Sequence, residues 1–167
     1  MKKILMTLLL LSVVLTLVGL ASGDELKFQA RLSGDNEVPP VDTDTTGKAK
    51  VEFNKDLTEA EFRLKVKDGD LVTRAHIHCA PAGQNGPIVV ALLEHRDGEV
   101  STVRLSEEVE LEATITGASI SNVACGATLE ELAQSMRDGN TYVNVHTVDN
   151  PAGVIRGQLK EENDDDD

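Results

Sequence analysis

The chain has 167 residues, a formal net charge of −13 and a hydrophobic content of 40%. This length suits one domain with short appendages. The charge excludes the usual nucleic-acid binder, which needs clustered Lys and Arg against phosphate. Neither a P-loop nor a GxGxxG pattern is present, so a nucleotide enzyme has no support.

The first 23 residues predict a secretory signal peptide, because a basic start precedes a long apolar run and then small residues. Cleavage is expected after Ala21 or Gly23. The alternative is an uncleaved anchor helix, since the apolar run of about 17 residues is intermediate between a signal and a membrane span. Both alternatives place residues 24–160 outside the cytoplasm: secreted, periplasmic or on the cell surface.

Alternation of polar and apolar residues then predicts a series of short strands separated by turn residues. Residues 60–67 show the pattern best, with Ala60, Phe62 and Leu64 separated by charged residues. The predicted strands are 27–34, 49–53, 60–67, 71–79, 87–94, 99–105, 109–116, 141–148 and 153–160. Such a series favours an all-β antiparallel sandwich or barrel.

One short helix interrupts the strands. Thr128 and Glu131 form a capping-box pattern, and Gly139 is a natural stop. The apolar stripe of this helix consists of Leu129, Leu132, Ala133 and Met136. Residues 161–167 hold six acids and predict a solvated, disordered tail.

Strand parity gathers three of the four histidines on one face. His76 and His78 alternate with apolar residues on one strand, and His146 alternates with valines on another. Asn144 and Arg156 have the same parity on their own strands. We expect this face to point away from the core, and we expect Asn144→Asp to be tolerated if the face is solvated.

A histidine pair spaced H-x-H on a strand, joined by a third histidine, suits a mononuclear copper or zinc ion at His76, His78 and His146. Arg156 and Asn144 would lie around that ion. The alternative interpretation is a structural hydrogen-bond network without metal. His95 lies beside a turn and is expected at the surface, and Glu37 belongs to an acidic loop without EF-hand spacing.

Two cysteines, Cys79 and Cys125, are expected to form one disulfide in an oxidising compartment. Two buried free thiols are the alternative. The inward parity of Cys79, next to His78, favours the disulfide over a metal-bound thiolate.

Several of these segments resemble the CHRD domain, named after chordin. The matching stretches are FQARLSG from Phe28, NEVPP from Asn36, AHIH from Ala75, NGP from Asn85, YVNVHT from Tyr142 and NPAGVIRGQL from Asn150. The resemblance covers about residues 27–160 and implies an extracellular module of poorly defined biochemical function. Because the cysteine-rich modules of chordin are absent, its growth-factor role is not carried over.

The resemblance also implies an immunoglobulin-like sandwich similar to that of Cu,Zn superoxide dismutases. His76-Ile77-His78 looks like the copper-binding pair of that family, and His146 like another copper ligand. The stretch from Gly153 to Arg156 resembles the one that ends in the anion-guiding arginine of that family, which implies that the fixed charge of Arg156 steers a small anion. No bridging histidine and no histidine-rich zinc loop is identifiable, so a dinuclear dismutase is not expected. The sequence therefore predicts a binding module with copper or zinc at three histidines, and alternatively a structural or adhesive envelope domain or a redox protein. It does not identify a protein or small-ligand partner, and enzymatic activity stays an open question.

Overall fold

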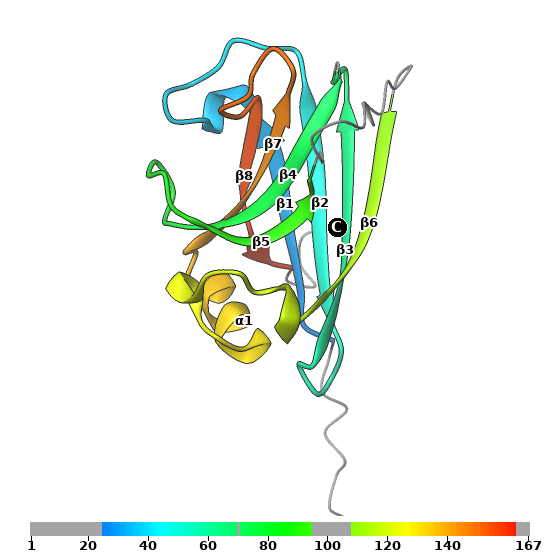
Figure 1. Cartoon of the computed structure of the whole chain (residues 1–167), viewed down its shortest axis with the longest axis vertical. Helices are drawn as coiled ribbons and strands as arrows, with labels where there is room; N and C mark the ends of the chain where they lie inside the picture. The colour runs from blue at the N-terminus through cyan, green and yellow to red at the C-terminus, as the bar shows by residue number, and fades with distance from the viewer. Residues whose placement is uncertain (1–24, 70, 95–107, 163–167) are drawn as a thin grey trace, which may run out of the picture.

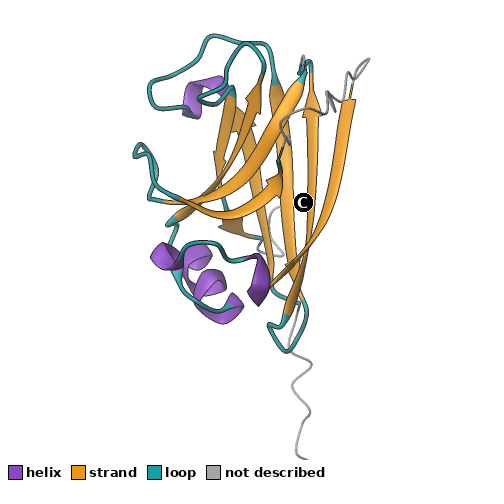
Figure 2. Cartoon of the chain, in the orientation of Figure 1, coloured by secondary structure: helices purple, strands orange, loops and turns teal. Residues whose placement is uncertain are grey.

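The computed structural model describes residues 25–69, 71–94 and 108–162. The strands in these ranges are β1 (Lys27–Ser33), β2 (Thr46–Phe53), β3 (Glu59–Lys67), β4 (Val72–Cys79), β5 (Ile88–Leu93), β6 (Glu108–Thr116), β7 (Thr141–Thr147), β8 (Ile155–Gln158) and β9 (Lys160–Glu161). One α-helix, α1 (Leu129–Arg137), and three 3₁₀ turns, η1 (Gly34–Asn36), η2 (Gly117–Ser119) and η3 (Val123–Cys125), complete the described elements (Figure 2).

The strands form one curled antiparallel sheet in the order β5-β4-β7-β8-β1-β2-β3-β6, with β9 paired to β1. Figure 1 shows β4, β5, β7 and β8 as one layer and β1, β2, β3 and β6 as the other. A bridge between Val90 and Ile120 joins β5 to the segment after β6, so the two edges of the sheet nearly meet. The predicted antiparallel all-β fold is therefore confirmed, as a sandwich that almost closes into a barrel.

Aliphatic side chains from the inner faces of both layers fill the core, as the scarcity of aromatic residues predicts. Leu64 on β3, Ile77 on β4 and Val145 on β7 are 0–1% exposed. Fully burying a side chain of this size contributes about 1.5–3 kcal/mol. The alternation that places these side chains inside places the polar residues of β4, β7 and β8 on the opposite face.

The predicted helix is confirmed in its bounds and its capping. Thr128 Oγ1 accepts from Glu131 N at 3.2 Å, and the Glu131 carboxylate accepts from Thr128 N at 3.3 Å. Leu129, Leu132, Ala133 and Met136 are all buried. The helix packs at one end of the sandwich (Figure 1).

Most predicted strands are confirmed within one to three residues at their ends. The predicted strand 153–160 is wrong as a single element, because it divides into β8 and β9 around the buried Leu159. The predicted strand 99–105, His95, the leader 1–23 and most of the tail 161–167 lie outside the described residues. Among the described helices, none is long and apolar enough to span a membrane.

Candidate metal centre

Strand register assembles the three histidines. β4 pairs with β7 so that Arg74 lies opposite His146, and His76 lies opposite Asn144. His78 is two residues further along β4, on the same face. The predicted gathering of these three imidazoles on one face is therefore confirmed.

The ring nitrogens come within metal-binding range of one another. His76 Nδ1 lies 3.1 Å from His146 Nε2, and one nitrogen from each of the three rings lies within 4.8 Å of the others. Two nitrogens on one tetrahedral zinc ion, each with a bond of about 2.0–2.1 Å, lie about 3.3 Å apart. Small side-chain adjustments would bring all three nitrogens to that spacing.

Each ring has one nitrogen that faces the other two rings, the inner nitrogen, and one that faces away from them, the outer nitrogen. Every outer nitrogen has an oxygen acceptor. His78 Nδ1 faces Gly86 O at 2.9 Å, and His146 Nδ1 faces Pro151 O at 3.1 Å. His76 Nε2 faces Glu94 Oε1 at 2.6 Å. Because carbonyl and carboxylate oxygens can only accept here, each outer nitrogen carries the proton of its ring.

In the neutral rings, each inner nitrogen therefore carries a free lone pair. The inner nitrogens are His76 Nδ1, His78 Nε2 and His146 Nε2, and they converge. His78 Nε2 is buried and has no hydrogen-bond partner. Three converging lone pairs, one of them orphaned, fit a cation, and oriented outer nitrogens are the usual support of metal-bound histidines.

Burial favours the neutral, ligating form of two of these rings. Burial, with a smaller contribution from nearby His76, lowers the pKa of His146 from 6.5 to about 4. Burial also lowers the pKa of His78, although the Gly86 carbonyl opposes this effect. At neutral pH a metal ion would therefore not compete with protons at either ring.

The face that carries these polar side chains is covered and is not solvated. His76, Asn144, His146 and Arg156 are only 1–7% exposed. The reason is that the loop between β4 and β5 lies across the face: Arg156 Nη1 donates to Asn85 Oδ1 at 3.2 Å, and Gln158 Nε2 donates to Ala80 O at 2.9 Å. Asn85 Nδ2 in turn donates to Val38 O, which joins this loop to the segment after β1.

Arg156 has a different environment from that of an accessible anion guide. Its guanidinium lies over the Tyr142 ring, 3.4 Å from the centroid, and its Nη2 donates to Pro81 O. The His78 ring stacks on Tyr142 at 4.8 Å with an interplanar angle of 9°. Arg156 thus supports the cluster through Tyr142 and the covering loop, and the anion-steering role stays a prediction.

Glu37 is a buried polar residue whose role the sequence did not reveal. Its Oε1 accepts from Asn144 Nδ2 at 2.6 Å, and burial raises its pKa from 4.5 to about 7, although the nearby Arg156 charge opposes the rise. Only the fold of the Glu37 loop over β7 removes this carboxylate from water.

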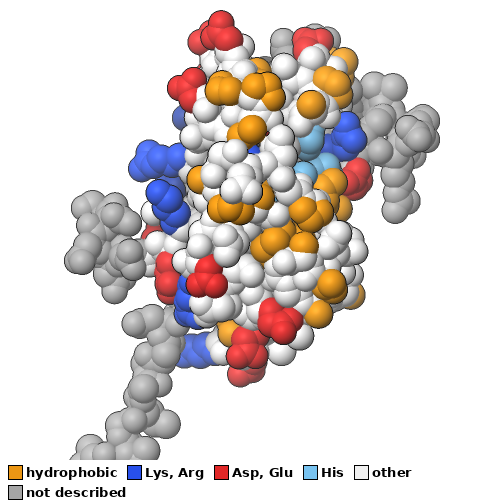
Figure 3. All heavy atoms as spheres, turned by 90° about the vertical axis from the view of Figure 1, so that its left-hand side faces the viewer, with side chains coloured by type: hydrophobic (Ala, Val, Ile, Leu, Met, Phe, Trp, Pro, Cys, Tyr) orange, Lys and Arg blue, Asp and Glu red, His pale blue; other side chains and the backbone are white. Residues whose placement is uncertain are grey.

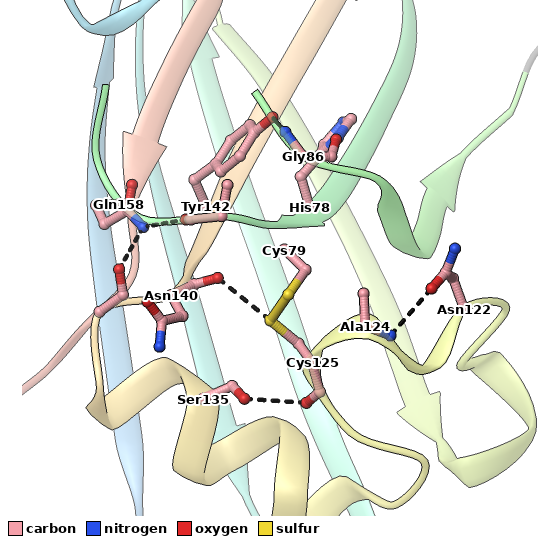
Figure 4. Close-up of a disulfide and its surroundings, with 12 residues drawn as sticks. His78, Cys79, Gly86, Asn122, Ala124, Cys125, Ser135, Asn140, Tyr142 and Gln158 are labelled. Carbon is pink, nitrogen blue, oxygen red and sulfur yellow. Dashed lines mark hydrogen bonds between the residues drawn. A yellow bond between two sulfur atoms is a disulfide. The ribbon is translucent and has the colours of Figure 1, made fainter. Parts of the chain in front are cut away.

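A disulfide fixes the strand that carries two of the histidines. Cys79 and Cys125 are bonded, with their Cα atoms 5.5 Å apart, so the predicted disulfide is confirmed. Figure 4 shows Cys79 directly after His78, with the bond leading to the turn before α1, where Ser135 Oγ donates to Cys125 O. The end of β4 is thereby tied to the helical end of the sandwich.

The cluster reaches the molecular surface despite its burial. Histidine atoms appear in pale blue on the face drawn in Figure 3, beside basic, acidic and hydrophobic side chains. They belong to this cluster, because His95 is outside the described residues. His78 is partly exposed, and Glu94 has a side chain that is 48% exposed. Solvent therefore has access to one side of the cluster.

The CHRD domain family model matches residues 28–159, which is most of the chain. The chain belongs to the CHRD domain family. No curated protein matched the sequence. The matched CHRD range contains all three histidines, both cysteines, Tyr142 and Arg156, so the centre and its supports lie within the family domain itself.

Proposed function

We propose that this CHRD domain is an extracytoplasmic module that binds one copper or zinc ion through His76, His78 and His146. The observation that carries the proposal is the set of three converging lone pairs, each fixed by an acceptor on the far side of its ring. Imidazole nitrogens suit both metals, and general affinity trends favour Cu²⁺ over Zn²⁺.

Different residues of the chain have different roles in holding such an ion. The three rings supply the donors, and Gly86, Pro151 and Glu94 fix their orientation. Tyr142 and Arg156 hold the His78 ring and the covering loop in place. A bound ion would supply Lewis acidity or, for copper, one-electron chemistry.

The extracytoplasmic part of the proposal rests on the leader-like first 23 residues and on the disulfide, which fits an oxidising compartment. Mass spectrometry of the protein isolated from its native host tests this part. A mature chain that begins at Ser22 or Asp24, recovered outside the cytoplasm, would support it. A full-length chain in the cytoplasm would contradict it.

Metal titration tests the centre. The purified protein, stripped with a chelator, is titrated with Zn²⁺ and Cu²⁺, and the bound metal is measured by elemental analysis. We expect one ion per chain, and a loss of affinity of at least 100-fold in His78→Ala. The matched control is His95→Ala, which removes the fourth histidine of the sequence, one that is not among the three proposed ligands, and should keep one ion per chain.

The alternative function is a structural or adhesive envelope domain in which the same side chains form only hydrogen bonds. In that case a protonated His76 donates to both Glu94 and His146, which the same short distances allow. Wild-type protein that stays metal-free on challenge with both ions, at unchanged thermal stability, would favour this alternative.

A further inference from the structure

Glu94 differs in kind from the other two groups that orient the histidines. Gly86 and Pro151 offer neutral backbone carbonyls, whereas Glu94 offers a carboxylate at 2.6 Å from His76 Nε2. The His76 side chain is 2% exposed, whereas that of Glu94 is 48% exposed. A charged acceptor thus reaches a buried ring from the solvent side.

A β-bulge places Glu94 on the histidine face. On β5, Ala91 lies opposite His76, but the next pair joins Leu93 to Ala75, so Leu92 is an extra residue. If the side chains of residues 91–94 alternated regularly, Leu93 would share the face of Ala91, and Glu94 would point toward the core. The one-residue shift reverses the two and brings Glu94 onto the outer side, beside His76.

A carboxylate that accepts the outer proton of a ligating imidazole makes the inner nitrogen a stronger donor. It also adds a negative charge near the ion. Both effects favour a divalent ion over a monovalent one, because a doubly charged ion gains more from negative charge and from a strong donor. Neutral carbonyls at the other two rings give no such preference.

We propose that Glu94 is a positioning residue that makes the three-histidine centre selective for Cu²⁺ and Zn²⁺ over Cu⁺. This inference rests on the proposed function of the centre. Beyond that function, it states that the centre prefers a divalent ion and that Glu94 causes this preference.

The test is Glu94→Gln, in which the amide oxygen can still accept from His76 Nε2 while the charge is lost. We expect the dissociation constants for Zn²⁺ and Cu²⁺ to rise at least tenfold, within the range typical of such supporting residues. The dissociation constant for Cu⁺, measured anaerobically against a competing chelator, should change less than threefold. If the dissociation constant for Cu²⁺ rises ten times more than that for Cu⁺, the reduction potential of the site rises by about 59 mV, which voltammetry measures independently.

The matched control is Glu112→Gln, which removes an exposed carboxylate that pairs with Arg63 on the far layer. It should leave all three affinities and the potential unchanged. Equal changes for Cu⁺ and Cu²⁺ in Glu94→Gln, or no change in either, with normal wild-type binding, would overturn this inference alone. Failure of the wild-type protein to bind any metal would overturn the proposed function and this inference together.

Discussion

Asn144 illustrates how a polar residue on a strand face can be part of the interior. Its Nδ2 donates to Glu37 Oε1 at 2.6 Å and also to Ile155 O. Gly153, at a φ of +136°, packs so closely that an added Cβ would lie 2.7 Å from Asn144 Nδ2 and 2.8 Å from Glu37 Oε1. Asn144, Glu37 and Gly153 thus form one closely packed unit.

Tolerance of Asn144→Asp required a solvated face, and because Asn144 is buried we expect this variant to be destabilised instead. The variant replaces a buried donor with a carboxylate that faces the Glu37 carboxyl, so we expect the free energy of unfolding to fall by about 2–3 kcal/mol. Urea denaturation measures this loss. Asn122→Asp is the matched control: its exposed side chain accepts from Ala124 N, and Asp can accept the same bond. Equal stabilities of the two variants would contradict the buried position of Asn144.

Glu37 should make stability depend on pH. Its pKa is about 7 in the folded protein against an ordinary value of 4.5, so the folded state holds the proton more tightly. The contribution of Glu37 to stability is thus complete below pH 4.5 and is lost as pH rises through 7.

Comparison of Glu37→Gln with the wild type isolates this contribution, because the lowered pKa of His146 acts in the opposite direction. We expect the stability of Glu37→Gln relative to the wild type to rise between pH 5 and pH 8 by about 2 kcal/mol. Thermal melts across this range measure it. A stability difference that is independent of pH would show that Glu37 titrates normally.

At the scale of elements, β8 is the point where the two layers join. Ser33 on β1 pairs with Arg156 on β8, and an added Cβ at Gly157 would lie only 2.4 Å from Arg31 O. The junction therefore requires a residue without a side chain at Gly157. The same strand carries Arg156 and Gln158 to the covering loop, so the junction also positions the loop over the histidines.

Gly157→Ala should consequently separate β8 from β1. We expect a destabilisation of about 2–3 kcal/mol, because the obstructing atom is backbone and cannot rotate away. Gly117→Ala is the control, since an added Cβ there meets nothing within 4 Å. Chemical denaturation compares the two, and a cost below 0.5 kcal/mol in both would contradict the close approach of these strands.

At the scale of the whole molecule, one covalent bond connects the metal-centre strand to the helical end. The disulfide spans 46 residues of sequence and is the covalent link between β4 and the η3–α1 segment. In the chain-entropy account, closing a loop of this length stabilises the fold by about 3–4 kcal/mol.

The double variant Cys79→Ala with Cys125→Ala should lose about that amount of stability in urea denaturation. Leu129 and Leu132 of α1 remain buried in the core, so the fold itself should persist, as circular dichroism would show. Wild-type protein treated with a reductant should show a similar loss. Unchanged stability in both samples would indicate that packing alone holds this end together.

The sequence by itself determined the elements and their faces. Period-2 alternation located the strands, because side chains of a strand point alternately to the two faces. Thr128 and Glu131 located the helix start, because capping is a local interaction. The same alternation assigned His76, His78 and His146 to one face.

Only the tertiary structure decided what covers that face and what fixes each ring. The loops that bury Asn144 and Glu37 and the β5 bulge that turns Glu94 toward His76 depend on contacts between residues far apart in the chain. Alternation distinguishes the two faces of a strand but does not show whether loops or water cover the polar one. Whether loops or water cover that face depends on the path of the chain in space, and the same path determines the shape of the metal centre.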